Sequence, residues 1–305
     1  MILLDPEDVV RAEGPWSHRD VPANGARFHV AELGSGPLVL LLHGFPTFWW
    51  TWRHALPVLA DAGYRAVAMD LRGYAGSDHP PRGYDPFTLS ADVAGVIRSL
   101  GERNAVIVGQ GWGGFLAWTT GVLQPEVVRA IAPVSMPHPR RLRASLLGDA
   151  AQRRASAYVY GFQVPAGPER DLLEDGAAEV GLLLHAWSAT PSWPDQHAEA
   201  TYRAAMLLLN TAHCALEYHR WAMRSIPRPD GIRFAKRMKQ PVMAPVLHVQ
   251  GGDDPTVLPS SARGSQAYVT GPYRWAELAG VGHFPQEEQP EAFHALLLDW
   301  LASLP

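Results

Sequence analysis

The sequence contains a single cysteine, Cys214, among 305 residues. One thiol excludes internal disulfides, thiolate metal clusters and Cys-x-x-Cys redox chemistry as properties of this chain. Lysine is also scarce, since Lys236 and Lys239 are the only two, and the formal net charge at pH 7 is −4. This weakly acidic balance argues against nucleic acid or an anionic membrane as a partner.

Long hydrophobic runs are also missing. The longest strongly apolar run, Leu38–Leu42, is far shorter than the roughly 20 residues that a membrane-spanning helix needs. Residues 1–8 are acidic and lack the basic segment that opens a secretory signal peptide. We therefore expect a soluble protein of the cytoplasm.

Strand and helix patterns alternate along most of the chain, and 47% of the residues are hydrophobic. Strands are predicted at residues 17–21, 27–33, 37–42, 65–70, 104–108, 129–134, 245–250 and 273–278, and helices at 52–62, 89–100, 198–209 and 293–301. Ser90 is the predicted N-cap of the second helix, and Asn24-Gly25 predicts a hairpin turn. The alternation predicts an α/β fold with a mostly parallel central sheet and helices on both faces.

The middle of the chain differs from its two ends. Residues 137–240 lack strand patterns and contain helical stretches rich in Arg, Ala, Leu and Trp. We therefore predict one sheet domain, residues 1–136 and 241–305, interrupted by a helical insert. An insert between strands of an α/β sheet falls where ligands bind, so we expect a lid over a pocket.

Two strand-to-loop junctions in the first half suggest catalytic machinery. The stretch His-Gly-Phe-Pro at 43–46 follows a predicted strand, and the amide of Phe45 can point into a pocket as an oxyanion donor. The stretch Gly-Gln-Gly-Trp-Gly at 109–113 has the pattern of a nucleophile elbow, with Gly111 at the nucleophile position. A dinucleotide-binding loop is disfavoured, because no acidic residue ends a strand about 20 residues later.

Two later strand ends carry an acid and a histidine. Asp254 follows the predicted strand 245–250, and His283 follows the predicted strand 273–278. The chain order of nucleophile, acid and histidine is typical of α/β-hydrolases. In that arrangement Asp254 orients the His283 imidazole and stabilises its charged form.

These motifs together resemble the α/β-hydrolase superfamily, and within it the epoxide-hydrolase-like branch. The resemblance covers nearly the whole chain, and 109–113 match the branch's Gly-[His/Gln]-Asp-Trp-Gly at every position except Gly111. It implies an α/β-hydrolase fold with a helical lid, and it implies the amides of Phe45 and Trp112 as oxyanion donors. Tyr158, ahead of Phe-Gln-Val-Pro at 162–165, is similar to one ring-opening lid tyrosine. The second lid tyrosine has no clear match, and His213 lies roughly at its place.

Gly111 is the main departure from that branch. There a carboxylate at this position attacks the epoxide carbon, and the histidine then activates water to cleave the ester. Glycine has no side chain, so covalent catalysis through this position is impossible, and activity is expected to be reduced or altered. Three hypotheses remain: His283 acts as a general base on water, the chain is a silent relative that binds a hydrophobic ligand, or Gly111 is an engineered deletion of the nucleophile.

Two neighbouring enzyme classes fit less well. Haloalkane dehalogenases share the tryptophan at Trp112, whose indole N–H can hold a halide. They usually carry a polar residue where Phe45 stands, and they need the same missing carboxylate. A serine esterase needs serine at position 111.

The remaining expectations concern the pocket and the partners. The predicted substrate pocket contains His43, Pro46, Trp50, Gln110 and His213. No clustered spacing of His, Asp or Glu suggests a metal, and no cofactor is expected. We expect a small or medium apolar molecule as substrate, and a monomer or homodimer.

Overall fold

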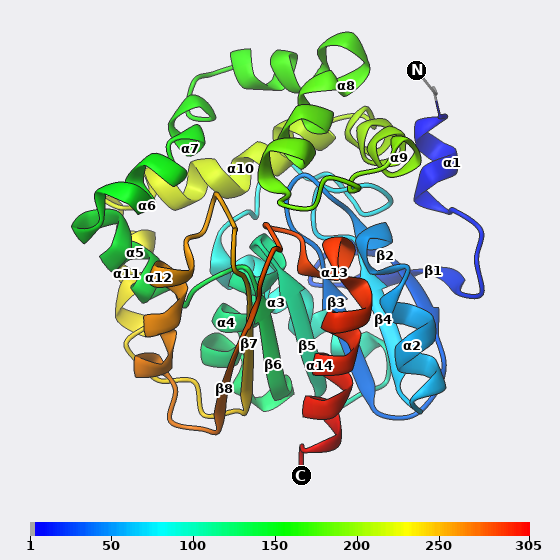
Figure 1. Cartoon of the computed structure of the whole chain (residues 1–305), viewed down its shortest axis with the longest axis vertical. Coiled ribbons are helices and arrows are strands. Elements are labelled where there is room, and N and C mark those ends of the chain that lie inside the picture. Colours follow the sequence, from blue (N-terminus) through cyan, green and yellow to red (C-terminus); the bar gives the residue numbers. More distant parts are fainter. Residues whose placement is uncertain (1–3) are drawn as a thin grey trace.

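A computed structural model describes residues 4–305, and an eight-stranded sheet lies at its centre (Figure 1). The strands are β1 (Ser17–Ala23), β2 (Ala26–Leu33), β3 (Leu38–Leu42), β4 (Arg65–Met69), β5 (Ala105–Gln110), β6 (Val128–Val134), β7 (Val246–Gly251) and β8 (Tyr273–Leu278). Their spatial order is β1-β2-β4-β3-β5-β6-β7-β8. The pairs β1–β2 and β2–β4 are antiparallel, and every other neighbouring pair is parallel. The predicted α/β class and mostly parallel sheet are confirmed.

Helices cover both faces of this sheet. The α-helices are α1 (Pro6–Val10), α2 (Ala55–Asp61), α3 (Pro86–Ser99), α4 (Trp112–Leu123), α5 (Pro139–Gly148), α6 (Ala150–Ala155), α7 (Tyr158–Gly161), α8 (Gly167–Trp187), α9 (Gln196–Met206), α10 (Thr211–Arg224), α11 (Pro229–Arg237), α12 (Pro259–Ala262), α13 (Pro285–Glu288) and α14 (Pro290–Ala302). Short 3-10 turns lie at Trp49–Trp52, Pro125–Val127 and Arg263–Tyr268. Figure 1 shows α2 and α14 on one face of the sheet and α3 and α4 on the other.

The central strands are buried on both faces, as their continuous apolar runs predict. All residues of β3 and β5 are buried, and β3 pairs with β4 on one side and β5 on the other. Parallel neighbours end at the same edge of the sheet, so the loops after β3 and β5 emerge side by side. This edge carries the residues that sequence analysis marks as catalytic.

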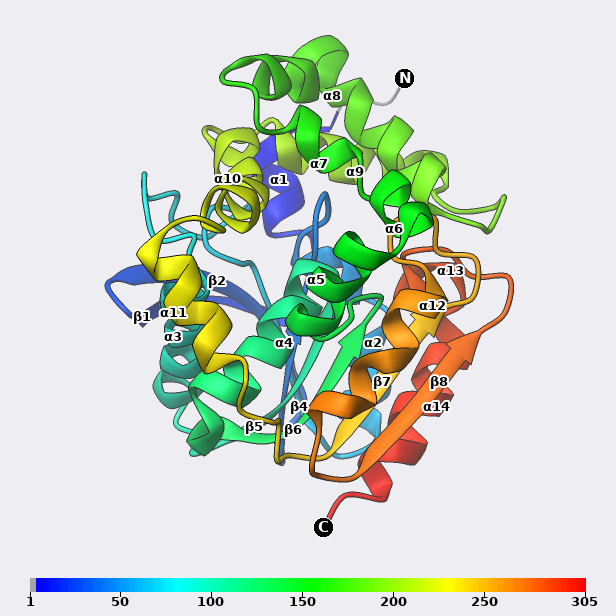
Figure 2. The same ribbon diagram turned by 90° about the vertical axis from the view of Figure 1, so that its left-hand side faces the viewer.

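The segment between β6 and β7 forms a helical layer over that edge. It contains α5 to α11, and both views show α7 to α10 lying beyond the ends of the strands (Figures 1 and 2). The N-terminal helix α1 packs against α9 of this layer. The position of this helical layer agrees with the expected lid. The predicted domain boundaries at 136–137 and 240–241 stay a prediction.

One predicted helix start is wrong. Helix α3 begins at Pro86, and the Asp85 carboxylate caps it by accepting hydrogen bonds from the amides of Phe87 and Thr88. Ser90 is buried one turn inside the helix, where its hydroxyl donates to Thr119 at 3.1 Å. Asp85 followed by proline at the first helical position is itself a helix-start signal, and it outweighs the serine.

Across residues 4–305, no helix combines the length and the apolar character that crossing a membrane requires.

Candidate active site

Gly111 forms the sharp turn between β5 and α4. Its backbone has φ +53° and ψ −117°, a conformation that side-chain-bearing residues rarely adopt. The turn also brings strand and helix very close together, because a Cβ on Gly109 would lie 2.1 Å from the carbonyl oxygen of Gly113. The glycines around position 111 are therefore required by the backbone geometry, as the elbow pattern predicts.

The sequence-predicted acid and histidine lie together. His283 Nδ1 lies 2.8 Å from Asp254 Oδ2, and the Asp254 side chain is fully buried. With Nδ1–H donated to the carboxylate, the neutral tautomer leaves Nε2 as an acceptor facing away from Asp254. This ring is therefore oriented to take a proton at Nε2.

The Asp254 carboxylate is held by its own loop. Oδ1 accepts hydrogen bonds from the amides of Thr256 and Val257 and from the Thr256 hydroxyl, and Oδ2 accepts one from Gln250 Nε2 at 3.1 Å. Thr256 Oγ1 also lies 2.9 Å from His283 Nδ1. Sequence reasoning missed Thr256, although Asp-x-Thr at a strand end is a side-chain-to-backbone turn signal.

The Nε2 atom of His283 faces Gly111. A Cβ built on Gly111 would lie 3.4 Å from Nε2 and 3.6 Å from the Cα of Gly44. Apart from the two chain neighbours, nothing else lies within 4 Å of that position. We call this space beside Gly111 the notch.

Two backbone amides border the same turn. Within the described chain, the N–H groups of Phe45 and Trp112 have no hydrogen-bond acceptor, while the Gly111 amide donates to the Val134 carbonyl at 3.0 Å. Trp112 is the first residue of α4, so its amide is one of the unpaired donors at a helix N-terminus. The Phe45–Pro46 peptide is cis.

Tyr158 is the first residue of α7 and lies among aromatic rings. Its ring contacts those of Phe162, Trp187 and His219 at centroid distances of 5.6, 4.9 and 6.1 Å. Burial, together with the Asp254 charge, raises the pKa of Tyr158 above its usual range. The hydroxyl therefore stays protonated, which suits a proton donor.

His219 is a buried residue near Tyr158 that sequence reasoning missed. It is buried on α10, and its Nε2 accepts a hydrogen bond from the Trp112 indole at 3.0 Å. Burial lowers the pKa of His219 to about 4, so the ring is neutral near pH 7. Ala215, Tyr218 and His219 share the buried face of α10, and this i, i+3, i+4 spacing is the signal that could have found it.

His213 does not join these residues. Half of its side chain is exposed, and its Nδ1 pairs with Glu169 of α8 at 3.1 Å. His219 lies six positions further along the helix, which turns the two side chains to different faces of α10. His219, rather than His213, is the α10 histidine beside Tyr158.

Three other predicted pocket residues are packed into the protein. His43 is fully buried, with Nδ1 donating to the Gly44 carbonyl and Nε2 accepting from the Leu71 amide. Gln110 donates through Nε2 to the carbonyl of His283 at 2.9 Å. This bond connects β5 to residues 279–284, the loop between β8 and α13 that we call the histidine loop.

The Trp50 ring also lies elsewhere. It packs against Tyr202 and His197 of α9, with the Arg53 guanidinium 3.5 Å from its ring centre. Pro46 stays next to the site through its peptide bond with Phe45.

Glu288 forms hydrogen bonds with both the histidine loop and the residues that follow α8. Its Oε2 accepts hydrogen bonds from the amides of Gly282, Ala189 and Thr190, and its Oε1 accepts one from Phe284 at 3.0 Å. The His283 amide donates to the carbonyl of Trp187 at 2.8 Å. The backbone on both sides of His283 is therefore tied to the end of α8.

The neighbouring Glu287 makes a second tie. Its carboxylate accepts from Arg53 at 2.7 Å, from the Trp193 indole at 3.1 Å and from the Tyr202 hydroxyl. Arg53 follows the 3-10 turn Trp49–Trp52, whereas Trp193 and Tyr202 belong to the helical layer between β6 and β7. Glu287 therefore links these two parts of the structure.

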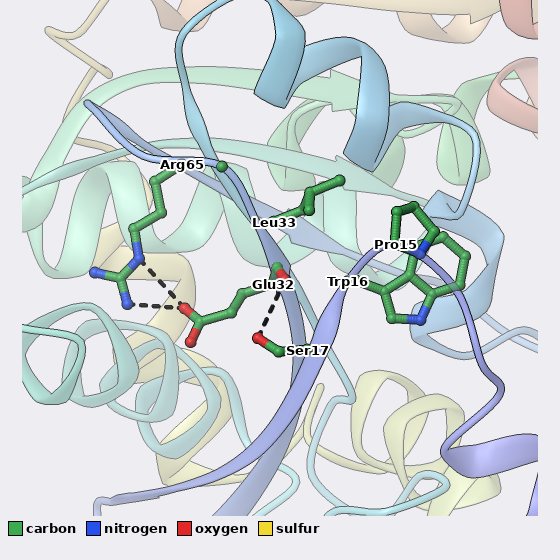
Figure 3. Close-up of a pocket in the computed structure, with 7 residues that line it drawn as sticks. Pro15, Trp16, Ser17, Glu32, Leu33 and Arg65 are labelled. Atoms are coloured by element: carbon green, nitrogen blue, oxygen red, sulfur yellow. Dashed lines mark hydrogen bonds and ion pairs between the residues drawn. The ribbon is translucent and has the colours of Figure 1, made fainter.

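A surface hollow of about 360 Å³ lies away from this machinery (Figure 3). It lies beside β1 and β2, where Glu32 pairs with Arg65 at 2.8 Å near the Trp16 ring. Its lining includes the Ser17 hydroxyl but no histidine that could act as a base for it, so the hollow does not compete with the Gly111 site. Within residues 4–305, no group of three His, Cys, Asp or Glu side chains is placed to hold a metal ion.

Comparison with known proteins gives one consistent result. A family model described as alpha/beta hydrolase fold matches residues 37–290. Epoxide hydrolase 3 of Xenopus tropicalis is 31% identical over 95% of this chain and 78% of its own length. Epoxide hydrolase A of Mycobacterium tuberculosis is 28% identical over 95% of this chain and 99% of its own length.

Solved structures agree. Epoxide hydrolase A from Mycobacterium thermoresistibile has a TM-score of 0.82 at 28% identity, covering 95% of this chain and 99% of its own. The Bacillus megaterium epoxide hydrolase in complex with an inhibitor has a TM-score of 0.84 at 26% identity, covering 93% of this chain and 100% of its own. The chain therefore belongs to the α/β hydrolase fold family, with epoxide hydrolases among its homologues.

Proposed function

We propose that the chain is an epoxide-hydrolase-like hydrolase that acts on a small or medium apolar molecule, with activity limited by the missing side chain at Gly111. The observation that carries the proposal is the approach of His283 Nε2 to within 3.4 Å of the Cβ position of Gly111. Position 111 is thus within reach of a general base, as a nucleophile must be. The aromatic rings of Phe45, Phe162 and Trp187 support an apolar substrate.

Each residue has a role in this proposal. The Gly111 turn corresponds to the nucleophile elbow, and the free amides of Phe45 and Trp112 form an oxyanion hole. Asp254 keeps the His283 ring oriented, and Tyr158 is the lid acid. The chain acts as a monomer or homodimer in the cytoplasm.

The reaction open to these groups is direct hydration. His283 Nε2 takes a proton from a water in the notch, and the hydroxide oxygen attacks an epoxide carbon. The ring C–O bond breaks, and Tyr158 gives its proton to the departing oxygen. The proton on His283 then returns to the Tyr158 phenolate through water, so epoxide and water become a diol.

The rate of this route is low. Loss of a nucleophile typically costs about a million-fold in turnover and leaves roughly a thousand-fold advantage over water from binding and the oxyanion donors. A second candidate function is therefore a silent protein that binds a hydrophobic ligand. The aromatic rings around Tyr158 favour it, because they offer apolar contacts to a ligand without needing a residue that attacks.

A panel of epoxides tests the proposal with three proteins: the unmodified chain, Gly111→Asp and His283→Ala. Diol formation by the unmodified chain that disappears in His283→Ala supports direct hydration. Activity that appears only in Gly111→Asp supports a dormant epoxide site. No turnover by any of them, with ligands that raise the melting temperature, supports the binding protein instead.

A further inference from the structure

Two backbone amides that could donate hydrogen bonds to an anion lie at the turn beside the notch. The Trp112 amide stands at the N-terminus of the twelve-residue helix α4, and the Phe45 amide is also free. A helix N-terminus carries partial positive charge and favours negative ligands. The backbone therefore offers two unpaired donors and a helix dipole at one turn.

A buried side chain independently points into the same space. The His283 side chain is only 7% exposed, and Nδ1 is engaged by Asp254 and Thr256. Within the described chain, Nε2 has no hydrogen-bond partner, and it is the nearest atom to the Cβ position of Gly111. The Tyr158 hydroxyl likewise has no hydrogen-bond partner among residues 4–305.

The carboxylates around the notch are already satisfied. Asp254 lies behind the His283 ring and accepts hydrogen bonds from Gln250, Thr256 and Val257. Glu288 is saturated by loop and lid amides. No carboxylate oxygen of the described residues lies within 4 Å of the Gly111 Cβ position. The space beside Gly111 therefore has anion donors and no anion.

We propose that the notch binds a small free carboxylate of the formate or acetate class, which supplies the attacking oxygen that Gly111 lacks. The claim that the notch binds a carboxylate follows from the donors just described. The claim that this carboxylate attacks an epoxide rests on the proposed function. Formate has three heavy atoms, which is fewer than the four that an aspartate side chain would place there. The amides of Phe45 and Trp112 hold the bound anion beside His283.

The step balances without an oxidant or reductant. A formate oxygen forms a bond to one epoxide carbon, the ring C–O bond breaks, and Tyr158 gives its proton to the freed oxygen. The product is a hydroxyalkyl formate ester. His283 then takes a proton from water, which adds to the ester carbonyl and releases diol and formate. The proton on His283 returns to the Tyr158 phenolate and restores its hydroxyl.

Binding is tested without any turnover. Sodium formate is titrated into the unmodified chain labelled with nitrogen-15 histidine, with sodium chloride at equal ionic strength as the salt control. We expect a saturable shift of the His283 Nε2 signal. Gly111→Asp, whose own carboxylate fills the notch, is expected to show no such shift. No saturable shift in the unmodified chain, or equal shifts in both proteins, overturns the inference.

Turnover tests the chemistry and separates it from the proposed function. We expect saturating formate to raise epoxide conversion by the unmodified chain at least about tenfold, yet far below Gly111→Asp, because tethering is worth an effective molarity on the order of 10⁵ M or more. In His283→Ala with formate, the formate ester should accumulate. If Gly111→Asp converts epoxides and formate leaves the unmodified chain unchanged, the inference fails and the proposed function stands. If formate binds and neither protein converts epoxides, the proposed function fails and the anion site stands.

Discussion

Gly111 avoids a backbone strain that a side chain would bring at this turn. A residue with a Cβ at φ +53° and ψ −117° pays a strain cost that glycine avoids. In the proposed function, the same glycine leaves His283 Nε2 facing a position without an attacking group. Glycine at this position therefore favours the stability of the fold at the expense of the proposed chemistry.

Replacing Gly111 by alanine should lower the free energy of unfolding by about 1–3 kcal/mol, the cost of a sparsely populated backbone conformation. The new Cβ would meet His283 Nε2 at 3.4 Å and Gly44 Cα at 3.6 Å, which are ordinary contacts. The cost is therefore backbone strain and not a clash. Urea unfolding curves measure it.

Two other glycines serve as controls for that prediction. Gly101 has φ +88° and open space around its Cβ position, so Gly101→Ala should cost a similar amount. Gly44→Ala should cost more than either, since its Cβ would lie 2.5 Å from Gln110 Oε1 and 2.8 Å from the Gln110 carbonyl. A loss for Gly111→Ala as large as that for Gly44→Ala would contradict the open notch.

The residues that sequence reasoning found differ physically from those it missed. Asp254 and His283 could be predicted because each follows a strand, and parallel strands deliver their ends to one edge. Helical spacing could mark His219 as buried, but the contacts of Glu288 and His219 could not be assigned, because their partners lie about a hundred residues away in sequence, at Thr190 and Trp112. Lid contacts of this kind depend on how the insert docks, which local patterns do not encode.

At the scale of elements, the histidine loop and the end of α8 behave as one unit through Glu288. Glu288→Gln keeps one oxygen for the amides of Gly282, Ala189 and Thr190 and turns an NH₂ group toward the Phe284 amide. We expect a loss of about 1.5–3 kcal/mol in unfolding free energy, the contribution of one hydrogen bond to a charged group. Hydrogen exchange at Phe284 should rise in parallel.

The matched control is an exposed acid. Glu126 pairs with Arg98 at 2.8 Å with both side chains more than half exposed, so Glu126→Gln should cost less than about 1 kcal/mol. If Glu288→Gln proves as mild as Glu126→Gln, with unchanged exchange at Phe284, Glu288 does not hold the histidine loop.

Strands could be predicted where burial on both faces of the sheet produces a continuous apolar run. The runs 37–42 and 104–108 gave β3 and β5 because both are buried on two faces. The start of α3 was missed because Asp85 caps the helix a full turn before its apolar stripe begins. The left-handed residues Asp175, Gly176 and Ala177 within α8 were also outside what helical periodicity can predict.

For the whole molecule, buried histidines predict acid sensitivity. Burial lowers the pKa of His219 and His294 to about 4 and that of His138 and His248 to about 3, from an ordinary 6.5. The unfolded chain binds protons below about pH 6.5, whereas the native histidines stay neutral. Stability therefore falls as pH falls from 6.5 toward 4, by up to about 1.4 kcal/mol per pH unit for each histidine.

Chemical denaturation at about pH 7 and about pH 5 checks this slope, because carboxylates of ordinary pKa contribute mainly below that window. His294→Gln removes one of these four histidines, and the unfolding free energy of this variant should therefore change less between the two pH values. An unfolding free energy that is the same at both pH values would contradict four neutral, buried imidazoles.

Intact-protein mass spectrometry tests the central claim most directly, using Gly111→Asp combined with His283→Ala. In this variant the new carboxylate can attack an epoxide, while the group that would hydrolyse the ester is absent. The account predicts a mass increase equal to one epoxide molecule, located by peptide mapping at residue 111, with no adduct on the unmodified chain. A folded double variant that gains no mass, or gains it at another residue, would contradict the placement of position 111 as the point of attack.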